Sequence, residues 1–288
     1  MLYISSLCSK KNKIGNAVCQ LAELGFKNIE LTGGTIFYNN FESDLISLQK
    51  EYKLDYLIHN YFPPPKKDFV INIASRKFDI KKRTIALVKE ALRFARKFGK
   101  NLYTMHPGFI SELLPELKDK FFIKDGRTIN LKEDFYKAVE SLSEEVIPIN
   151  FRIGVENLGL KTANDKFSFL CGSDDVEQFL IYFRNNERVG LLLDLGHLNV
   201  ASQILRFDRD LFLDRIVDNY GKKIFAFHLS ENNGHIDSHR VLPVDSWQIK
   251  YLMKYRKIFS NVPIVFEWHD AASKQTYEHF KIIEDVLN

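Results

Sequence analysis

Short apolar runs alternate with stretches of helical spacing along all 288 residues, and this alternation limits the possible folds more than any other feature. The runs are rich in Val, Ile, Leu, Phe and Tyr, and we expect strands at residues 2–7, 27–31, 56–59, 102–106, 152–156, 189–194, 223–228 and 262–267. Helices are expected at residues 14–24, 41–52, 80–98, 135–147, 174–183, 208–219, 247–258 and 277–286. A strand followed by a helix, repeated eight times, predicts an α/β fold with a single (β/α)8 TIM barrel.

A doubly wound open sheet is the main alternative to the barrel. Such a sheet would spread the ends of its strands along a line, and it would usually carry a glycine-rich phosphate turn after the first strand. Here the first expected strand continues into Cys8-Ser9-Lys10-Lys11, which contains no glycine. We therefore expect one barrel domain that spans residues 1–288.

Two long connections interrupt the alternation, at about residues 63–79 and 109–132. Loops of this length in a compact barrel commonly cover or bind the substrate, because the barrel itself holds the residues that do the chemistry. We expect substrate specificity to lie in these two loops.

Composition and charge restrict the partners and the location. The chain is 45% hydrophobic but has no apolar stretch long enough to cross a membrane, so no membrane partner is expected. It starts directly in a strand, which predicts no signal peptide and a cytoplasmic location. The net charge of +4 comes from dispersed lysines and is compatible with a phosphate-bearing substrate, but it does not by itself indicate nucleic acid. Three scattered cysteines, Cys8, Cys19 and Cys171, predict reduced thiols.

Nine potential metal ligands lie at or after the downstream ends of six expected strands. They are His59, His106, Glu156, Asp194, His197, His228, Asp237, His239 and Glu267. A single carboxylate at a strand end is usually a cap or an ion pair, and a lone histidine on an apolar strand is more often a core residue. In a barrel, however, the carboxyl ends of the strands meet at one face, so this set predicts an active site. Carboxylates and imidazoles suit Zn or Mn, and also Mg or Co.

Two of these ligand pairs are close in sequence. Asp194 and His197 are three residues apart where the chain leaves the sixth expected strand, so both can point into the same cavity. Asp237 and His239 lie in a polar loop, where such residues more often form turns. Neither pair indicates a metal site by itself. Each becomes a candidate because the other potential ligands also lie at or after strand ends.

Several segments of the chain also carry a family resemblance. They are residues 25–31 (GFKNIEL), His59, 72–75 (NIAS), 106–108 (HPG), 155–157 (VEN), 194–197 (DLGH), 228–229 (HL) and 266–267 (FE). Together they resemble the xylose-isomerase-like TIM barrels, which include sugar phosphate isomerases and epimerases and the DNA-repair enzyme endonuclease IV. The resemblance covers essentially the whole chain and implies the same barrel fold.

The isomerases and epimerases of this superfamily typically hold one divalent ion with a Glu, Asp, His, Glu set. By resemblance, the set in this chain is Glu156, Asp194, His228 and Glu267. The resemblance implies that Glu156 and Glu267 are catalytic and transfer a proton through a metal-stabilised enediolate. It also implies that His197 and Arg240 contact substrate oxygens, and His269, close behind Glu267, is a further substrate-facing candidate.

Endonuclease IV adds two histidines and an Asp-x-His pair to build a three-zinc cluster. By that resemblance the three ligand groups are His59, His106 and Glu156; Glu156, Asp194, His228 and Glu267; and His197, Asp237 and His239. Such a cluster activates water and neutralises a phosphate oxygen, as phosphodiester cleavage requires.

The sequence favours a sugar or sugar-phosphate isomerase or epimerase that binds one to three divalent ions. The reason is that residues 63–69 interrupt the segment that probes DNA in endonuclease IV, and that residues 229–234 are only partly like the signature of that enzyme. Residues 240–245 lack the glycines that both subfamilies usually place there. An endonuclease-IV-like zinc phosphodiesterase, with DNA as its partner, is the alternative. A catalytically silent barrel with a binding role is the third hypothesis.

Overall fold

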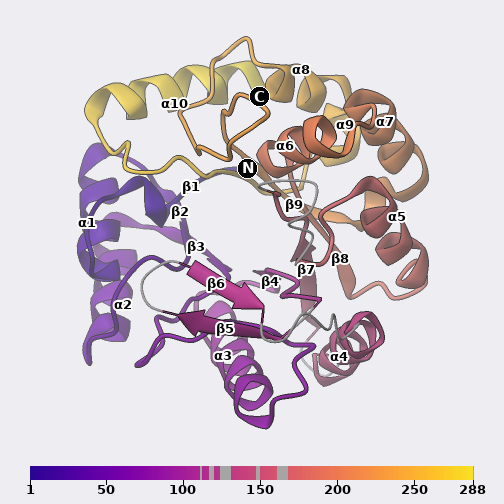
Figure 1. Ribbon diagram of the computed structural model, residues 1–288. Coiled ribbons are helices and arrows are strands. Elements are labelled where there is room, and N and C mark those ends of the chain that lie inside the picture. The colour runs from indigo at the N-terminus through magenta and orange to yellow at the C-terminus, as the bar shows by residue number, and fades with distance from the viewer. Residues whose placement is uncertain (111, 117–119, 124–130, 147–149, 161–167, 288) are drawn as a thin grey trace.

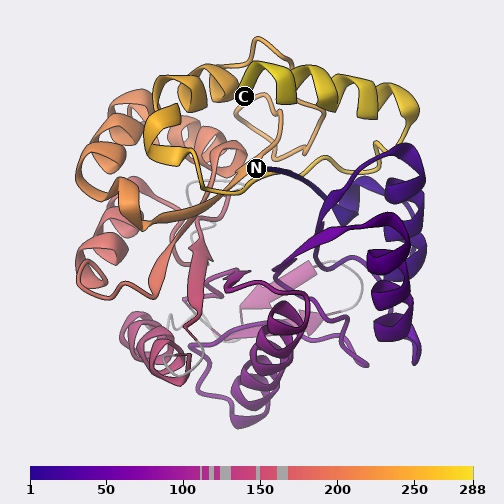
Figure 2. The ribbon, with the colours of Figure 1, turned by 180° about the vertical axis from the view of Figure 1, so that it is seen from behind.

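The computed structural model describes residues 1–110, 112–116, 120–123, 131–146, 150–160 and 168–287. Eight parallel strands form a closed barrel in the order β1-β10-β9-β8-β7-β4-β3-β2. They are β1 (Leu2–Ser5), β2 (Asn28–Leu31), β3 (Asp55–His59), β4 (Leu102–Met105), β7 (Arg152–Glu156), β8 (Val189–Asp194), β9 (Ile224–Leu229) and β10 (Ile264–Phe266). The helices surround this barrel, as both views along it show (Figure 1, Figure 2). The predicted (β/α)8 barrel is confirmed.

The helices follow the expected alternation closely. They are α1 (Ile14–Leu24), α2 (Phe41–Tyr52), α3 (Phe78–Lys97), α4 (Lys132–Glu145), α5 (Ser173–Tyr182), α6 (Leu195–Leu205), α7 (Arg209–Tyr220), α8 (Trp247–Lys254), α9 (Arg256–Phe259) and α10 (Lys274–Leu287). The bounds of α1 and α2 equal the predicted ones, because their apolar residues recur at helical spacing on the side that packs against the barrel. The predicted end of α4 at residue 147 lies outside the described residues.

Two helical features differ from the prediction. No helix was named between residues 194 and 208, but α6 starts directly after β8 because Asp194 caps it: its side chain accepts a hydrogen bond from the backbone N–H of His197. The single helix expected at residues 247–258 is divided at Tyr255, which separates α8 from α9.

Side chains along each strand alternate between the barrel interior and the layer beneath the helices. On β3, Leu57 packs against Tyr3 and Val265 in a small separate cluster, whereas Ile58 belongs to the main core. His59 follows, on the same side of the strand as Leu57. The same alternation on the other strands directs the predicted ligands toward the barrel axis.

The two long connections are present, and one contains secondary structure that we did not expect. Within residues 109–132 the chain forms an antiparallel hairpin of β5 (Leu113–Glu116) and β6 (Lys120–Ile123). This hairpin lies in front of the barrel beside β4 in Figure 1, and behind it in Figure 2. The remaining parts of this connection, residues 111, 117–119 and 124–130, lie outside the described residues.

The other connection runs from β3 to α3 and is held by Arg83 of α3. The guanidinium of Arg83 donates to the carbonyl oxygen of Lys67 at 2.6 Å and lies over the ring of Phe69, 4.2 Å from its centroid. No helix in the described part of the chain is both long and apolar enough to cross a membrane.

Candidate metal centre

The carboxylate of Glu156 lies between two groups of histidines at the carboxyl end of β7. Its Oε2 atom lies 3.3 Å from Nε2 of His59 and 3.3 Å from Nε2 of His106. Its Oε1 atom lies 3.2 Å from Nδ1 of His197 and 3.8 Å from Nδ1 of His228. Glu156 is fully buried, so both oxygens face protein groups and not bulk water.

All nine predicted ligands lie in three groups that meet within the barrel. The groups are His59, His106 and Glu156; Glu156, Asp194, His228 and Glu267; and His197, Asp237 and His239, and within each group the candidate ligand atoms lie within 4.8 Å of one another. Glu156 belongs to two of the groups. The structure thus brings the predicted ligands together, and their binding of metal ions stays a prediction.

Asp194 owes its orientation to its place at the junction of β8 and α6. Its Oδ1 atom accepts the backbone N–H of His197 at 2.6 Å, which satisfies one of the free amides at the start of the helix. Its Oδ2 atom is left to face Nδ1 of His228 at 3.9 Å. The cap therefore directs one carboxylate oxygen into the second group and brings His197 beside it.

Hydrogen bonds to backbone carbonyls set the protonation of two histidines in the third group. Nδ1 of His197 lies 2.9 Å from the carbonyl oxygen of Asn157, and Nδ1 of His239 lies 3.2 Å from that of Glu267. A carbonyl oxygen only accepts, so each Nδ1 carries the proton and each Nε2 is turned to Oδ2 of Asp237, at 2.9 Å in both cases. This is the usual arrangement of metal-binding histidines.

Several buried polar atoms at the centre have no hydrogen-bond partner among the described residues. They are both carboxylate oxygens of Glu156, Oδ2 of Asp194, Oδ1 of Asp237 and Nδ1 of His228. Buried polar atoms are almost always paired, and unpaired acceptors that converge on one place fit a bound cation. Carboxylate oxygens mixed with imidazole nitrogens fit Zn or Mn best among common divalent ions.

The carboxylates also change how readily the histidines hold protons. Burial opposes protonation of His197, but Asp194 and Asp237 keep its pKa well above the ordinary value. Burial likewise opposes protonation of His239, but the hydrogen bond with Asp237 raises its pKa to about 9. In contrast, burial lowers the pKa of His59 to about 4, so this ligand is neutral at pH 7. Metal ions that bind here must displace protons from the third group.

A cavity of about 680 Å³ lies beside the centre. It is lined by His106, His197, Asp237, His239, Glu267 and His269, together with apolar side chains such as Leu158, Leu160 and Ile236. The ring of His269 is stacked on that of His239, with centroids 4.0 Å apart and an interplanar angle of 8°. His269 is thus placed where a substrate could contact it.

Arg240 is placed differently from the other predicted site residues. Its backbone pairs with that of Glu231, its side chain is exposed, and it is not one of the described residues that line the cavity. A contact between Arg240 and substrate stays a prediction without geometric support.

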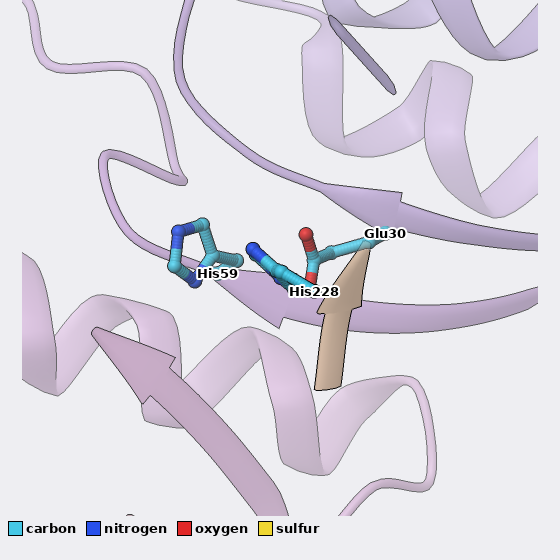
Figure 3. A group of neighbouring side chains, drawn as sticks. All are labelled: Glu30, His59 and His228. Atoms are coloured by element: carbon cyan, nitrogen blue, oxygen red, sulfur yellow. The ribbon is translucent and has the colours of Figure 1, made fainter. Parts of the chain in front are cut away.

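Glu30 is a site residue that the sequence reasoning missed. It lies on β2 with 1% exposure, and its Oε2 atom lies 3.1 Å from Nε2 of His228 (Figure 3). The available signal was an acidic residue between Ile29 and Leu31 in an apolar strand, where a charge is costly unless it has a partner.

Comparisons with known proteins agree with this fold. The probable endonuclease 4 of Metamycoplasma arthritidis is 28% identical over 241 residues, which cover 78% of this chain and 78% of that protein. The uncharacterized protein MJ1311 of Methanocaldococcus jannaschii is 22% identical over 263 residues, or 88% of this chain and 78% of the relative.

Among solved structures, a D-tagatose 3-epimerase-like protein superimposes with a TM-score of 0.73 at 19% identity, covering 99% of this chain and 96% of the other. The 3-keto-D-glucoside 4-epimerase of E. coli superimposes with a TM-score of 0.70 at 10% identity, covering 99% and 98%. These two likenesses show the fold alone. The model of the xylose isomerase-like TIM barrel family matches residues 18–281, and the chain therefore belongs to that family.

Proposed function

We propose that this protein is a multinuclear metal-dependent hydrolase that cleaves a phosphodiester, with DNA as the first substrate to test. The observation that carries the proposal is the position of Glu156, whose two oxygens face two different ligand groups. A centre with a single ion would use one of these groups. Two or three adjacent ions suit a phosphoryl group, because they neutralise the charge that develops on its oxygens.

The likeness to the probable endonuclease 4 supports the same proposal, since that relative matches 78% of this chain. The order of the two enzyme hypotheses is thus the reverse of the order that the sequence favoured. What supports the new order is that predicted ligands outside the Glu, Asp, His, Glu set lie beside that set. His59, His106 and His197 lie 3.2–3.3 Å from Glu156, and His239 lies 3.5 Å from Glu267.

Divalent ions bound here would supply positive charge and lower the pKa of a coordinated water, as hydrolysis at neutral pH requires. The residues of the chain hold the ions and orient the substrate. Glu156 keeps the first two groups next to each other, and Asp237 bridges His197 and His239 in the third. The ring of His269, at the cavity wall, is placed to contact a substrate oxygen.

An isomerase or epimerase is the second candidate. The observation that favours it is that Glu156 and Glu267 belong to the same four-residue group, where two carboxylates beside one ion could move a proton between carbon atoms. Solved structures with similar folds also carry the titles of sugar epimerases.

One variant separates the two candidates. His239→Ala removes a ligand of the third group and leaves the Glu156, Asp194, His228, Glu267 group intact. If the protein is a multinuclear phosphodiesterase, the wild type cleaves an abasic-site DNA duplex with strong salt dependence, and His239→Ala loses at least 100-fold of this activity, about 2.7 kcal/mol in the barrier.

The matched control is His279→Ala, because His279 contacts the carbonyl oxygen of Leu242 and belongs to none of the ligand groups. It should keep full activity. Absence of cleavage by the wild type, together with exchange of a carbon-bound proton of a ketose or sugar phosphate with deuterated water, would reverse the order of the two candidates.

A further inference from the structure

Glu30 and His228 form a buried pair across the barrel interior, from two strands that are separated by β1 and β10. Glu30 comes from β2 and His228 from β9, and the two side chains are exposed by 1% and 0%. Nε2 of His228 lies 3.1 Å from Oε2 of Glu30. In Figure 3 the imidazole of His228 lies between the carboxylate of Glu30 and the ring of His59.

His228 presents a different nitrogen to the centre from the other histidines. His59, His197 and His239 each use Nδ1 for a hydrogen bond to the protein, with Nε2 facing a carboxylate of the centre. His228 instead turns Nδ1 to the centre, 3.3 Å from Oε2 of Glu267. Its Nε2 must therefore carry the proton if Nδ1 is to bind an ion.

We propose that Glu30 is a positioning residue for His228. Its carboxylate accepts the Nε2–H bond, which fixes the tautomer and the orientation of the ring and turns the Nδ1 lone pair toward Glu156, Asp194 and Glu267. A carboxylate in this position also makes the imidazole a stronger ligand, because its negative charge favours electron donation to a cation. The proposal rests on the metal centre of the proposed function, but not on the reaction that occurs there.

Burial gives a second reason for this role. A carboxylate removed from water loses several kcal/mol of solvation, and Oε1 of Glu30 has no hydrogen-bond partner among the described residues. The hydrogen bond with His228 is the one that the described residues give to this carboxylate. A cation bound to Nδ1 of His228 would polarise the imidazole and strengthen the Nε2–H hydrogen bond to Glu30. Metal in the centre would therefore stabilise the buried carboxylate of Glu30.

Glu30 could instead be a metal ligand itself, since it lies within 4.8 Å of ligand atoms of His59 and His228. The geometry speaks against this. Nδ1 of His59 lies 3.0 Å from the hydroxyl of Thr104, and Nε2 of His59 faces Glu156 at 3.3 Å. Both nitrogens of His59 are therefore engaged elsewhere, and an ion beside Glu30 would have only His228 as a further partner.

The test uses zinc alone and the full-length protein. In Glu30→Gln the amide is neutral, and it can turn its NH₂ group toward the imidazole. We expect the same number of zinc ions per chain by native mass spectrometry. One of these ions should bind 10- to 100-fold more weakly in competition with a chelator. The ¹⁵N NMR spectrum of the zinc-loaded variant should show His228 no longer held in the Nε2–H tautomer.

Asp55→Asn is the matched control. Asp55 is also a strand carboxylate, but it pairs with Lys100 at 2.6 Å and with the hydroxyl of Tyr3, at the opposite end of β3 from His59. It should change thermal stability without changing zinc affinity or the His228 tautomer. If Glu30→Gln does not fold, Glu30→Asp is the second variant, because it keeps the charge but shortens the side chain. It should lower the affinity for the same zinc ion.

Two results would overturn the proposal. Unchanged zinc affinity and an unchanged His228 tautomer in the Glu30 variants would mean that Glu30 has a structural role only. Loss of one whole zinc ion would mean that Glu30 is a ligand. Neither readout involves a substrate, so a failure of the proposed phosphodiesterase activity would leave this test valid.

Discussion

Nε2 of His59 lies 3.3 Å from one oxygen of Glu156, a carboxylate whose other oxygen lies 3.2 Å from Nδ1 of His197. His59 comes from β3 and Glu156 from β7, and β4 lies between these two strands, so the contact does not follow from neighbouring strands. Glu156 belongs to both the first and the second ligand group, whereas His59 belongs to the first. Substitution of His59 should therefore remove one ion, and substitution of Glu156 should remove more than one.

His59→Ala should lower the zinc content by one ion per chain, because His59 belongs to the first of the three ligand groups and to neither of the other two. Zinc content is measured by elemental mass spectrometry of protein that was purified without chelator. His279→Ala should leave the content unchanged, since His279 lies outside the groups. The same zinc content in His59→Ala and wild type would show that the first group binds no ion.

Glu156→Gln should lower the zinc content by more than one ion. The amide keeps the shape of the carboxylate but carries no charge, and one of its two terminal atoms is a donor that cannot bind a cation. Zinc titration followed by native mass spectrometry counts the ions. A loss of one ion only would mean that Glu156 does not serve both groups.

Stability of the metal-free protein should fall as the pH rises from 6.5 to about 9. The pKa of His239 is raised from 6.5 to about 9, against burial, by Asp237 and Glu267. Between these values the folded state holds a proton that the unfolded state has released, so stability decreases with pH. The contribution is fully present below pH 6.5 and amounts to about 3 kcal/mol.

Thermal unfolding in the presence of a chelator, at several pH values, checks this trend. The zinc-loaded protein should not show it, because ions replace the protons at the same nitrogens. His239→Ala in its metal-free form should show a weaker decrease. A metal-free wild type with constant or rising stability over this range would contradict the raised pKa.

Much of the fold was predictable because the spacing and the length of the apolar runs both agree with a (β/α)8 barrel. The bounds of β7 and β8 equal the predicted ones, since each is a short, mainly apolar run ended by an acidic residue. Helix α6 was missed because Asp194 was interpreted as a ligand only, although it is also the helix cap. The hairpin of β5 and β6 was missed because residues 109–132 show no clear period in sequence.

The site was predictable where a ligand ends a strand, because the barrel brings the strand ends to one face. His59 and His106, which come from β3 and its neighbour β4, both reach Glu156 on β7 in this way. Glu30 could not be found by the same reasoning. It stands before the end of β2, and its partner His228 is 198 residues away in sequence, so only the closed barrel shows their contact.

Gly190→Ala tests the packing of the barrel independently of the metal centre. A Cβ atom at Gly190 would lie 2.6 Å from Cε2 of Phe225 and closer still to the carbonyl oxygen of Lys223. Since the backbone cannot yield easily, the free energy of unfolding should fall by roughly 1–3 kcal/mol, measured by urea denaturation. Gly221→Ala is the control, because its nearest neighbour is a side-chain methyl of Ile258 at 3.1 Å. A smaller loss at Gly190 than at Gly221 would contradict the packing of β8 against β9.

The number of zinc ions that one wild-type chain binds tests the multinuclear centre most directly. Native mass spectrometry of protein loaded with zinc and freed of excess metal gives this number without any assumption about the substrate. The three ligand groups, two of which share Glu156, predict three ions per chain, and at least two. A single ion, or none, would contradict the multinuclear centre and with it the proposed phosphodiesterase.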